Sequence, residues 1–581
     1  MSSILPPPVQ DSVPLVPPPQ VPLSSSSSST TPSNSVRPDA HTQKYDRQLR
    51  LWASSGQTAL ETSNVLIIGS NSTSTSSLKN LVLPGIGKFT ILDDQVVEEK
   101  DLGTNFFLSR DSLGKSRATE SVKYLKELNQ DVEGIAIVKN LSDFLNSNEN
   151  PLQSYNLILA VDLNPPSILS RLTEQAWQLG IPLISVETFG FYGSVSTQVE
   201  EICLVETHPE SLIDLRLNQP FKELIEFSTE FDYDKLDSAG LSHVPAVVIL
   251  VKALEEWKST HEGKVPEGMK ERKEFLDIYV LKGVRKGSDD ENFQEAVGLF
   301  RRAGNKRPIP EEIEKLFKDD SCQNLTSQSS NFWILLHTLK LFTQQQEQGG
   351  LLPLTGSLPD MKSHSKTYVK LQQVYRSKAK KDLQLFNVLL ETVIDSLSTG
   401  EGERREISKE EVESFVKHSG WLKVLRGRKL NDMIDSEKSL LKGKIDELLE
   451  QATWSSPPDQ SLSIYLAFQT SSRFYSKHSR YPGSSKDDLD GTKDVEEMFS
   501  LGEELLKELD YKGGDQLPES FSNSIKELCR SSHSTLPQTS ALLGGLVAQE
   551  SIKLITKQYV PLVGETCVWD GITSMTGRVR A

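Results

Sequence analysis

Runs of apolar residues alternate with stretches of helical pattern between residues 41 and 205. The apolar runs cover residues 65–69, 89–93, 157–162 and 182–186, and helical stretches between them include residues 77–83 and 115–128. Short apolar runs that alternate with helices are typical of parallel strands that are buried on both faces of a sheet. The pattern therefore predicts an α/β fold, a doubly wound, Rossmann-like sheet with right-handed crossovers.

A helical period replaces this pattern between residues 211 and 515. One helical face carries Val247, Leu250, Val251, Leu254 and Trp257, and another carries Phe332, Leu335, Leu339 and Phe342. Both faces are typical of core positions, and one long helix is expected over residues 366–397.

The end of the chain returns to the α/β pattern. A helix is expected over residues 542–554, and residues 559–562 and 566–569 predict a closing hairpin. A large helical insertion thus divides one α/β domain. The expected organisation is a tail at 1–40, a first α/β part at 41–210, the insertion at 211–515 and a last α/β part at 516–581.

The tail at residues 1–40 has a composition of its own. It contains proline clusters at 6–8 and 17–19, and a serine run at 24–29. Such a segment favours extended or coil states and buries little surface, so we expect a disordered tail, with a ligand for a proline-binding module as the alternative. It lacks the basic start and unbroken apolar stretch of a signal peptide.

Composition narrows the class of protein. Lys and Arg number 64 and Asp and Glu number 80, which gives a net charge of −16 and argues against a broad nucleic-acid surface. The basic runs at 378–381 and 426–429 are interpreted as solvated surface. No apolar run reaches the ~18 residues of a membrane span. Four scattered cysteines predict no disulfide framework and no zinc site, and they fit a reducing compartment.

The loop after the first apolar run is where a doubly wound fold usually binds phosphates. Glycines let the backbone approach the phosphates, and the helix N-terminus offers free N–H groups. Here Gly69 is followed at residues 70–77 only by Ser, Thr and Asn, whose side chains obstruct that approach. Hydroxyls that cap the helix are the favoured interpretation, and a dinucleotide-dependent dehydrogenase is poorly supported.

Several segments carry a resemblance to a known family. Residues 44–52, which include Arg47, and residues 80–87, 101–107, 113–118 and 544–554 occur in the order found in enzymes that activate ubiquitin-like proteins. Together they resemble the adenylation fold of those enzymes. Residues 214–221, 356–361 and 368–372 further resemble the regulatory subunits of the heterodimeric enzymes that activate the Nedd/Rub modifier. The resemblance covers residues 41–581.

The chain departs from the active pattern of that family. The later glycines of the loop are missing, Asp93-Asp94-Gln95 stands where the pattern has Asp-x-Asp, and Thr104 stands where it has an arginine. Losing a guanidinium removes both charge and bidentate geometry toward phosphate. Asp162 and Lys115 remain at matching positions. A lone Asp162 could hold magnesium, but a structural role is favoured.

The family's catalytic cysteine is also missing. None of Cys203, Cys322, Cys529 and Cys567 has its Pro-x-Cys-Thr context. Buried free cysteines are common, and Cys322, in a polar stretch, is expected to be the most exposed of the four.

The resemblance implies a non-catalytic regulatory subunit, a pseudo-adenylation half without a catalytic residue, cofactor or metal of its own. The partners would be a catalytic subunit that holds ATP and Mg and carries the thioester cysteine, and the Nedd/Rub modifier, with no nucleic acid or membrane and a cytoplasmic and nuclear location. Arg47 matches an arginine that contacts the phosphates of ATP in the partner's site, and the alternative is a salt bridge that holds the first helix. The rival functions are a free-standing adenylating or NAD-dependent enzyme and a pure scaffold.

Overall fold

The structure is a computed structural model that describes residues 38–147, 150–207, 214–285, 289–303, 309–397, 405–485, 492–514 and 516–581. The described part of the chain divides between Arg47 and Gln48 into two units, and the second unit runs from Gln48 to Ala581. In the first unit, the Asp39 carboxylate accepts a hydrogen bond from the N–H of Thr42 at 2.7 Å and caps α1 (Ala40–Lys44). The tail predicted for residues 1–40 thus ends in an ordered helix start, and residues 1–37 lie outside the described residues.

The second unit is built on an eight-stranded sheet in the order β10-β9-β6-β5-β4-β1-β2-β3. Its strands are β1 (Asn64–Ile68), β2 (Lys88–Leu92), β3 (Glu133–Ile137), β4 (Leu157–Val161), β5 (Leu183–Phe189), β6 (Tyr192–Gln198), β9 (Thr566–Asp570) and β10 (Met575–Val579). Neighbours from β3 to β5 are parallel, whereas β6, β9 and β10 are antiparallel to their neighbours. The predicted α/β, doubly wound fold is confirmed, and all four apolar runs are strands.

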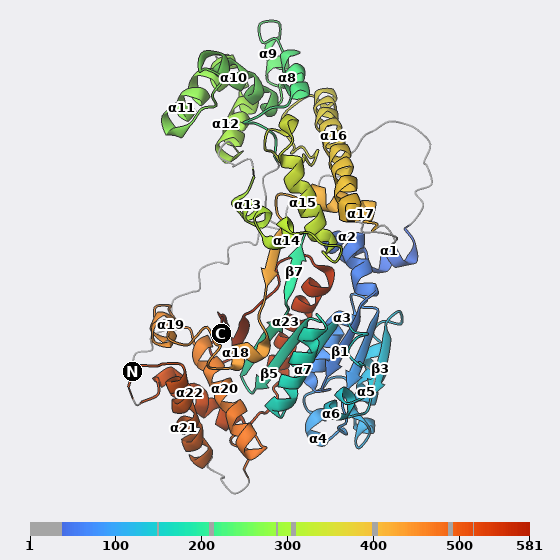
Figure 1. The fold of residues 1–581 in the computed structure, drawn as a ribbon, viewed down its shortest axis with the longest axis vertical. Helices are drawn as coiled ribbons and strands as arrows, with labels where there is room; N and C mark the ends of the chain where they lie inside the picture. The colour runs from blue at the N-terminus through green and yellow to red at the C-terminus, as the bar shows by residue number, and fades with distance from the viewer. Residues whose placement is uncertain are drawn as a thin grey trace, which may run out of the picture. The chain divides into compact units, whose positions relative to one another are not determined.

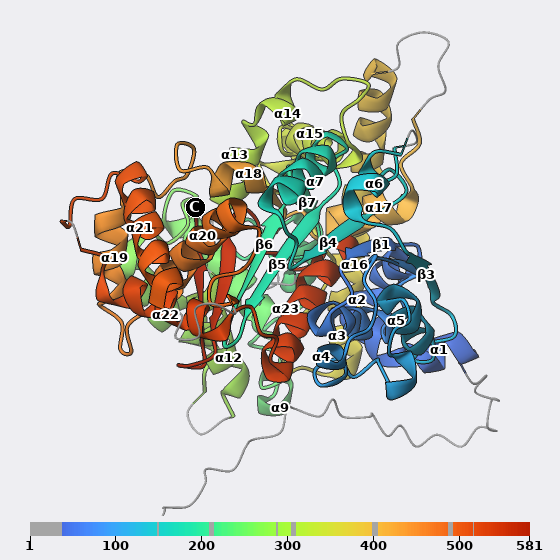
Figure 2. The ribbon, with the colours of Figure 1, turned by 90° about the horizontal axis from the view of Figure 1, so that it is seen from below.

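Two apolar cores cover the two faces of this sheet (Figures 1 and 2). On one face lie α2 (Asp46–Glu61) from Gln48 onward, which has a kink at Trp52 and Ala53, and α3 (Ser72–Val82), α5 (Arg117–Lys126) and α23 (Pro537–Thr556). On the other face lie α6 (Leu141–Leu145), α7 (Pro166–Gln178), α20 (Ser461–His478), α21 (Thr492–Glu508) and α22 (Glu519–Ser531). The short helices α4 (Glu99–Leu102) and η1 (Arg110–Ser112) follow β2.

The closing hairpin differs from the prediction. It consists of β9 and β10, and residues 559–562 form an irregular loop. Side-chain and backbone contacts hold this loop, because the N–H of Leu562 donates to Glu550 Oε2 at 2.6 Å and the N–H of Tyr559 donates to the carbonyl of Glu206 at 3.0 Å. Pro561 has no N–H to contribute to a sheet. An apolar run alone could not separate this loop from a strand.

The stretch between β6 and α20 contains two further cores. Around the first lie α8 (Lys222–Thr229), α9 (Ser238–Leu241), α10 (Ala246–Thr260), α11 (Gly268–Glu274), η2 (Phe275–Val280), η3 (Leu281–Gly283) and α12 (Glu291–Ala303). Around the second lie α13 (Glu311–Phe317), α14 (Asp320–Gln323), α15 (Asn331–Thr343), η4 (Gln346–Gln348), α17 (Lys409–Lys417) and a small sheet of β7 (Glu201–Leu204) and β8 (Lys423–Arg426). Helices α18 (Leu430–Ile434) and α19 (Ile445–Ala452) precede α20.

The long helix α16 (Ser365–Leu397) joins these two cores, as the sequence predicts. Leu371 and Tyr375 pack in the first core, and Phe386 and Leu390 pack in the second. Within the stretch predicted as one insertion at 211–515, α20 and α21 pack in the sheet's own core, apart from the two further cores. The limits at residues 210 and 515 stay predictions. Within the described ranges, no helix is both long and apolar enough to cross a membrane.

Candidate functional site

The carboxyl ends of β1, β2 and β4 meet at one edge of the sheet, where a doubly wound fold places its ligand. Gly69 ends β1 with a φ of +90°, and a side chain there would meet the carbonyl of Val161 at 3.0 Å. Helix α3 begins directly afterwards, and its N-cap is Asn71, whose Oδ1 accepts from the N–H of Ser74 at 3.0 Å. The predicted hydroxyl cap was wrong, because the amide oxygen of Asn71 takes that position.

The hydroxyls of α3 instead face the protein interior. Ser72 and Thr73 contact the hydroxyl of Ser540 on α23 at 2.8 and 3.1 Å, and Thr75 donates to Asn105 Oδ1 at 2.9 Å. At Gly544 the two helices approach so closely that an added Cβ would lie 2.6 Å from that of Ser76. The side chains that replace the loop glycines therefore serve the packing of α3 against α23.

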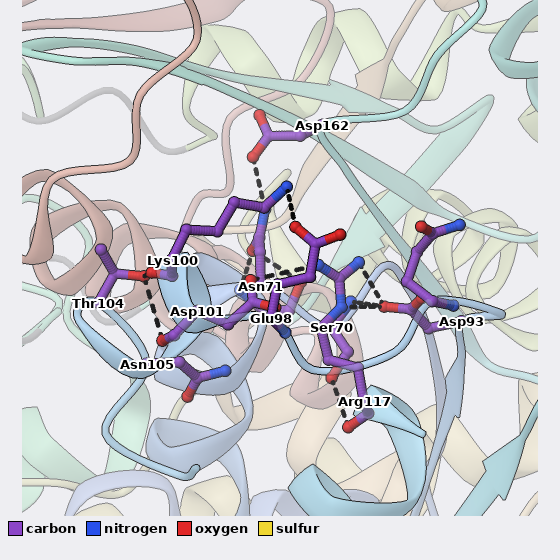
Figure 3. A network of polar contacts seen from close by, with 12 residues as sticks. Ser70, Asn71, Asp93, Glu98, Lys100, Asp101, Thr104, Asn105, Arg117 and Asp162 are labelled. Atoms are coloured by element: carbon purple, nitrogen blue, oxygen red, sulfur yellow. Dashed lines mark hydrogen bonds and ion pairs between the residues drawn. The ribbon is translucent and has the colours of Figure 1, made fainter. Parts of the chain in front are cut away.

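Asp93, at the end of β2, is bound entirely by its own chain (Figure 3). Its Oδ2 accepts from the N–H of Ser70 at 2.7 Å and from Arg117 Nε at 2.8 Å, and its Oδ1 accepts from the N–H of Gln95 at 2.8 Å. Arg117 Nη2 also lies 2.8 Å from Oδ2, and Arg117 Nη1 lies 3.6 Å from Asp101. With these partners and a side chain that is 3% exposed, the carboxylate offers little access to a ribose hydroxyl.

Burial explains why this pairing is needed. The side chain of Asp93 is 3% exposed and that of Arg117 is 16% exposed. Burial raises the pKa of Asp93 above its usual value, while the charge of Arg117 and the hydrogen bonds from Gln95, Arg117 and Ser70 act to lower it. The guanidinium of Arg117 thus supplies the positive partner that a buried carboxylate requires.

Asp162, at the end of β4, is closed in the same way. Its carboxylate accepts from Asn71 Nδ2 at 2.6 Å, from the N–H of Thr188 at 2.7 Å and from the hydroxyl of Thr188 at 2.8 Å. His533 Nε2 lies 3.7 Å away, and the side chain of Asp162 is 5% exposed. Three hydrogen-bond donors of the same chain thus engage a nearly buried carboxylate, which fits the structural role expected for Asp162.

The other two positions of the active pattern offer little to a nucleotide. Lys115 Nζ lies 4.0 Å from Glu120 and its side chain is 54% exposed. Thr104, in place of the arginine of the active pattern, carries no charge, and its hydroxyl contacts the carbonyls of Lys100 and Asp101 at 3.4 Å. Among the residues that the structure describes, no group of three or more His, Cys, Asp or Glu side chains could hold a metal ion.

The whole α/β unit matches a known family. The ThiF family pattern matches residues 45–581. The chain is 37% identical over 527 residues to a NEDD8-activating enzyme E1 regulatory subunit of Xenopus laevis, covering 89% of this chain and 95% of that protein. The chain belongs to the ThiF family, in the group of NEDD8-activating enzyme E1 regulatory subunits.

Relatives of the same description occur in distant organisms. The protein of Danio rerio is 36% identical, with coverage of 89% of this chain and 95% of that one. The regulatory subunit AXR1 of Arabidopsis thaliana is 34% identical, with coverage of 91% and 94%. Both alignments cover almost the full length of each protein. The helical stretch between β6 and α20 is therefore shared with these regulatory subunits, as the sheet is.

The four cysteines of this ThiF-family chain are poor nucleophiles. Burial raises the thiol pKa of all four cysteines and is the largest cause at each. The pKa is about 12 for Cys203 and Cys529 and about 11 for Cys322, and that of Cys567 is also raised. The expectation that Cys322 is the most exposed was wrong. It is 0% exposed in α14, and Cys203 and Cys567 are half-buried.

Arg47 lies near the start of α2, in the smaller unit. Its side chain is exposed, and the described part of the chain offers it no hydrogen bond or ion pair. The alternative of a salt bridge that holds the first helix therefore finds no support. Its role toward ATP in a partner stays a prediction.

Sequence reasoning missed the residues that close the site. Arg117 lies within the motif segment at residues 113–118, which assigns it no role of its own, and the sequence pattern assigns none to Asn71, Thr188 or His533. Each pairs with a carboxylate more than 20 residues away along the chain, or far more for His533. A usable signal exists for Arg117, because it begins α5, the helix that crosses from β2 to β3, and the start of such a helix lies at the same sheet edge as Asp93.

Glu187, on β5, is half-buried close to the same sheet edge. Burial and the charge of Asp162 raise the pKa of Glu187 to about 7, and the hydroxyl of Ser194 donates a long hydrogen bond of 3.4 Å. No chemistry at the nucleotide edge needs this carboxyl, but it makes the stability of the sheet depend on pH.

Proposed function

We propose that this chain is the non-catalytic regulatory subunit of a heterodimeric NEDD8-activating enzyme. One observation carries the proposal: Asp93 and Asp162, which would face the nucleotide in an active adenylation half, are both buried and bound by Arg117, Asn71 and Thr188 of the same chain. A half that has filled its own nucleotide site can support the reaction only from outside it. The curated relatives are named as regulatory subunits of this enzyme.

The chemistry belongs to the partner in this proposal. A catalytic subunit would bind ATP and Mg, adenylate the C-terminus of NEDD8 and carry the thioester cysteine. The four buried or half-buried thiols of this chain support that division, because thiols with raised pKa values yield little thiolate. The proposal includes a cytoplasmic and nuclear location.

Arg47 is the group that this chain would lend to the reaction. An exposed arginine that has no partner among the described residues can form bidentate hydrogen bonds to phosphate oxygens of a nucleotide held elsewhere. This contact separates a regulatory subunit from a pure scaffold. The free-standing enzyme is disfavoured by the closed nucleotide edge.

Calorimetric titration with Mg-ATP tests the proposal. The chain alone should give no micromolar binding, and the complex with its catalytic subunit should bind one ATP. Micromolar affinity of the chain alone would instead support a free-standing enzyme. If the two chains form no complex, the proposal that this chain is a subunit of a heterodimer is wrong.

A further inference from the structure

We infer that the N-terminal half of α16 is a docking strip for an acidic protein surface. The strip consists of Lys366, Lys370, Arg376 and Lys380, with the uncharged residues between them. The inference rests on the charges of this helix and holds whether or not the chain pairs with a catalytic subunit.

The strip is a local excess of positive charge on an acidic chain. Residues 362–381 contain seven Lys and Arg residues and no Asp or Glu, whereas the net charge of the chain is −16. Three of the seven are neutralised: Lys362 by Asp289 and Glu291, Lys378 by Asp382 and Lys381 by Glu223. The remaining four are the residues of the strip.

These four side chains are exposed and unneutralised. None of them forms a hydrogen bond or an ion pair with any residue in the described ranges. Asp360 and Arg376 both lie close enough to Tyr368 to act on its pKa, in opposite directions, yet they form no ion pair with each other.

The helix places the four cations on one face. At about 100° per residue they fall within a stripe roughly 120° wide, and from Lys366 to Lys380 the stripe is about 21 Å long. Helices α15 and α8 pack against α16, as Figure 1 shows, and the buried residues Leu371 and Tyr375 lie on the packed side. Val369, which is 48% exposed, lies within the stripe between Lys366 and Lys370 and adds an apolar contact near one end.

Unlike Lys378, which pairs with Asp382 one turn away, the four cations of the strip do not serve the helix itself. Its first turn has no acidic residue and contains Lys366, and its last turn has no basic residue and contains Asp395, so both ends oppose the helix dipole. Lys366 and Lys370, and likewise Arg376 and Lys380, are like charges spaced i, i+4, which repel each other. An arrangement that weakens the helix at several positions indicates a requirement from outside it.

An acidic protein surface fits this strip better than a nucleic acid or an anionic membrane. Four cations and an exposed valine match a patch with a few carboxylates around an apolar contact. A polyanion needs a broad basic surface, and the net charge of −16 works against its approach.

The test uses the full chain and a rhodamine-labelled, capped peptide, (Glu-Ala-Ala-Ala)4, in fluorescence anisotropy at low salt. The variant carries Lys366→Glu, Lys370→Glu, Arg376→Glu and Lys380→Glu, and binding should weaken by roughly tenfold or more. The helix should survive, since a glutamate in its first turn suits the dipole. Equal or higher thermal stability checks this point.

A matched control changes the net charge by the same amount. It carries Lys126→Glu, Lys139→Glu, Lys270→Glu and Lys417→Glu, four exposed positions scattered over the chain, and it should bind the peptide as the unmodified chain does. If both variants lose the same affinity for the peptide, net charge alone explains the effect and the inference of a docking strip is wrong. Absence of peptide binding, or tighter binding of duplex DNA or phosphatidylserine vesicles than of the peptide, would also overturn it.

Discussion

Replacing Arg117 by alanine should destabilise the α/β sheet, because it leaves the carboxylate of Asp93 buried without its cation. The side chain of Asp93 is 3% exposed, and two guanidinium nitrogens lie 2.8 Å from its Oδ2. Removing one partner of such a pair typically costs about 3–5 kcal/mol. Asp93 keeps two backbone N–H donors, from Ser70 and Gln95, so we expect the lower end, about 3 kcal/mol.

The loss should depend on pH with a definite sign. Burial already raises the pKa of Asp93, and removing the charge of Arg117 raises it further. A carboxyl whose pKa is higher in the folded than in the unfolded state loses stability as pH rises between the two values. The deficit of Arg117→Ala should therefore shrink below pH 5 and be largest at neutral pH, and adding Asp93→Asn should recover most of it.

Urea unfolding followed by tryptophan fluorescence measures this difference. Lys88→Ala is the control, because Lys88 pairs with Glu133 at 3.2 Å on the surface of the same sheet, with side chains 34% and 61% exposed. Such a pair is worth about 1 kcal/mol or less. If Arg117→Ala costs no more than Lys88→Ala, the closed-site account of Asp93 is wrong.

The remaining predictions concern the reaction and the buried groups. Arg47→Ala should slow NEDD8-dependent ATP–pyrophosphate exchange by the reconstituted pair roughly ten- to hundredfold at subsaturating ATP, with the heterodimer intact. Unchanged exchange, or an equal loss in the control Arg50→Ala, would make Arg47 a structural residue. Serine in place of Cys322, or of each other cysteine in turn, should leave thioester formation by the pair unchanged in a gel assay, and loss in any folded variant would contradict this. At pH values above 7, Glu187→Gln should raise the thermal midpoint of unfolding by the equivalent of about 1–2 kcal/mol, and below about pH 4 it should have no effect. The reason is that Glu187, with a folded-state pKa near 7, costs folding stability as it ionises with rising pH. A shift of the midpoint that is independent of pH would refute this.

The sequence predicted those parts of the fold that local patterns determine. Strands β1, β2, β4 and β5 are apolar on both faces, so their runs stand out, and α16 keeps a helical period over its whole length. Strand β6 was missed because its buried positions include Ser194, Ser196 and Thr197, which bury polar groups among hydrogen-bonding neighbours. Nothing in a local pattern distinguishes such a strand from a loop.

The candidate site shows the same division. The absence of glycines after Gly69 is visible in the sequence and predicts that phosphates are kept out. What fills the site is not visible, because Arg117 and Thr188 reach their carboxylates only after the sheet has formed. Cys322 was misjudged for a related reason, since its polar neighbours in sequence conceal a buried side of the short helix α14.

The order of the strands has a consequence for synthesis of the chain. Strand β6 ends at Gln198, but its neighbour β9 begins only at Thr566, and α23, which covers the sheet with Leu543 and Val547, comes shortly before it. At the usual ribosomal rate the gap lasts on the order of half a minute. During that time the edge of β6 has no partner strand and the part of the sheet face that α23 covers stays open, which exposes strand edge and apolar surface of a kind that favours aggregation. A truncation before β9 leaves the edge of β6 unpaired.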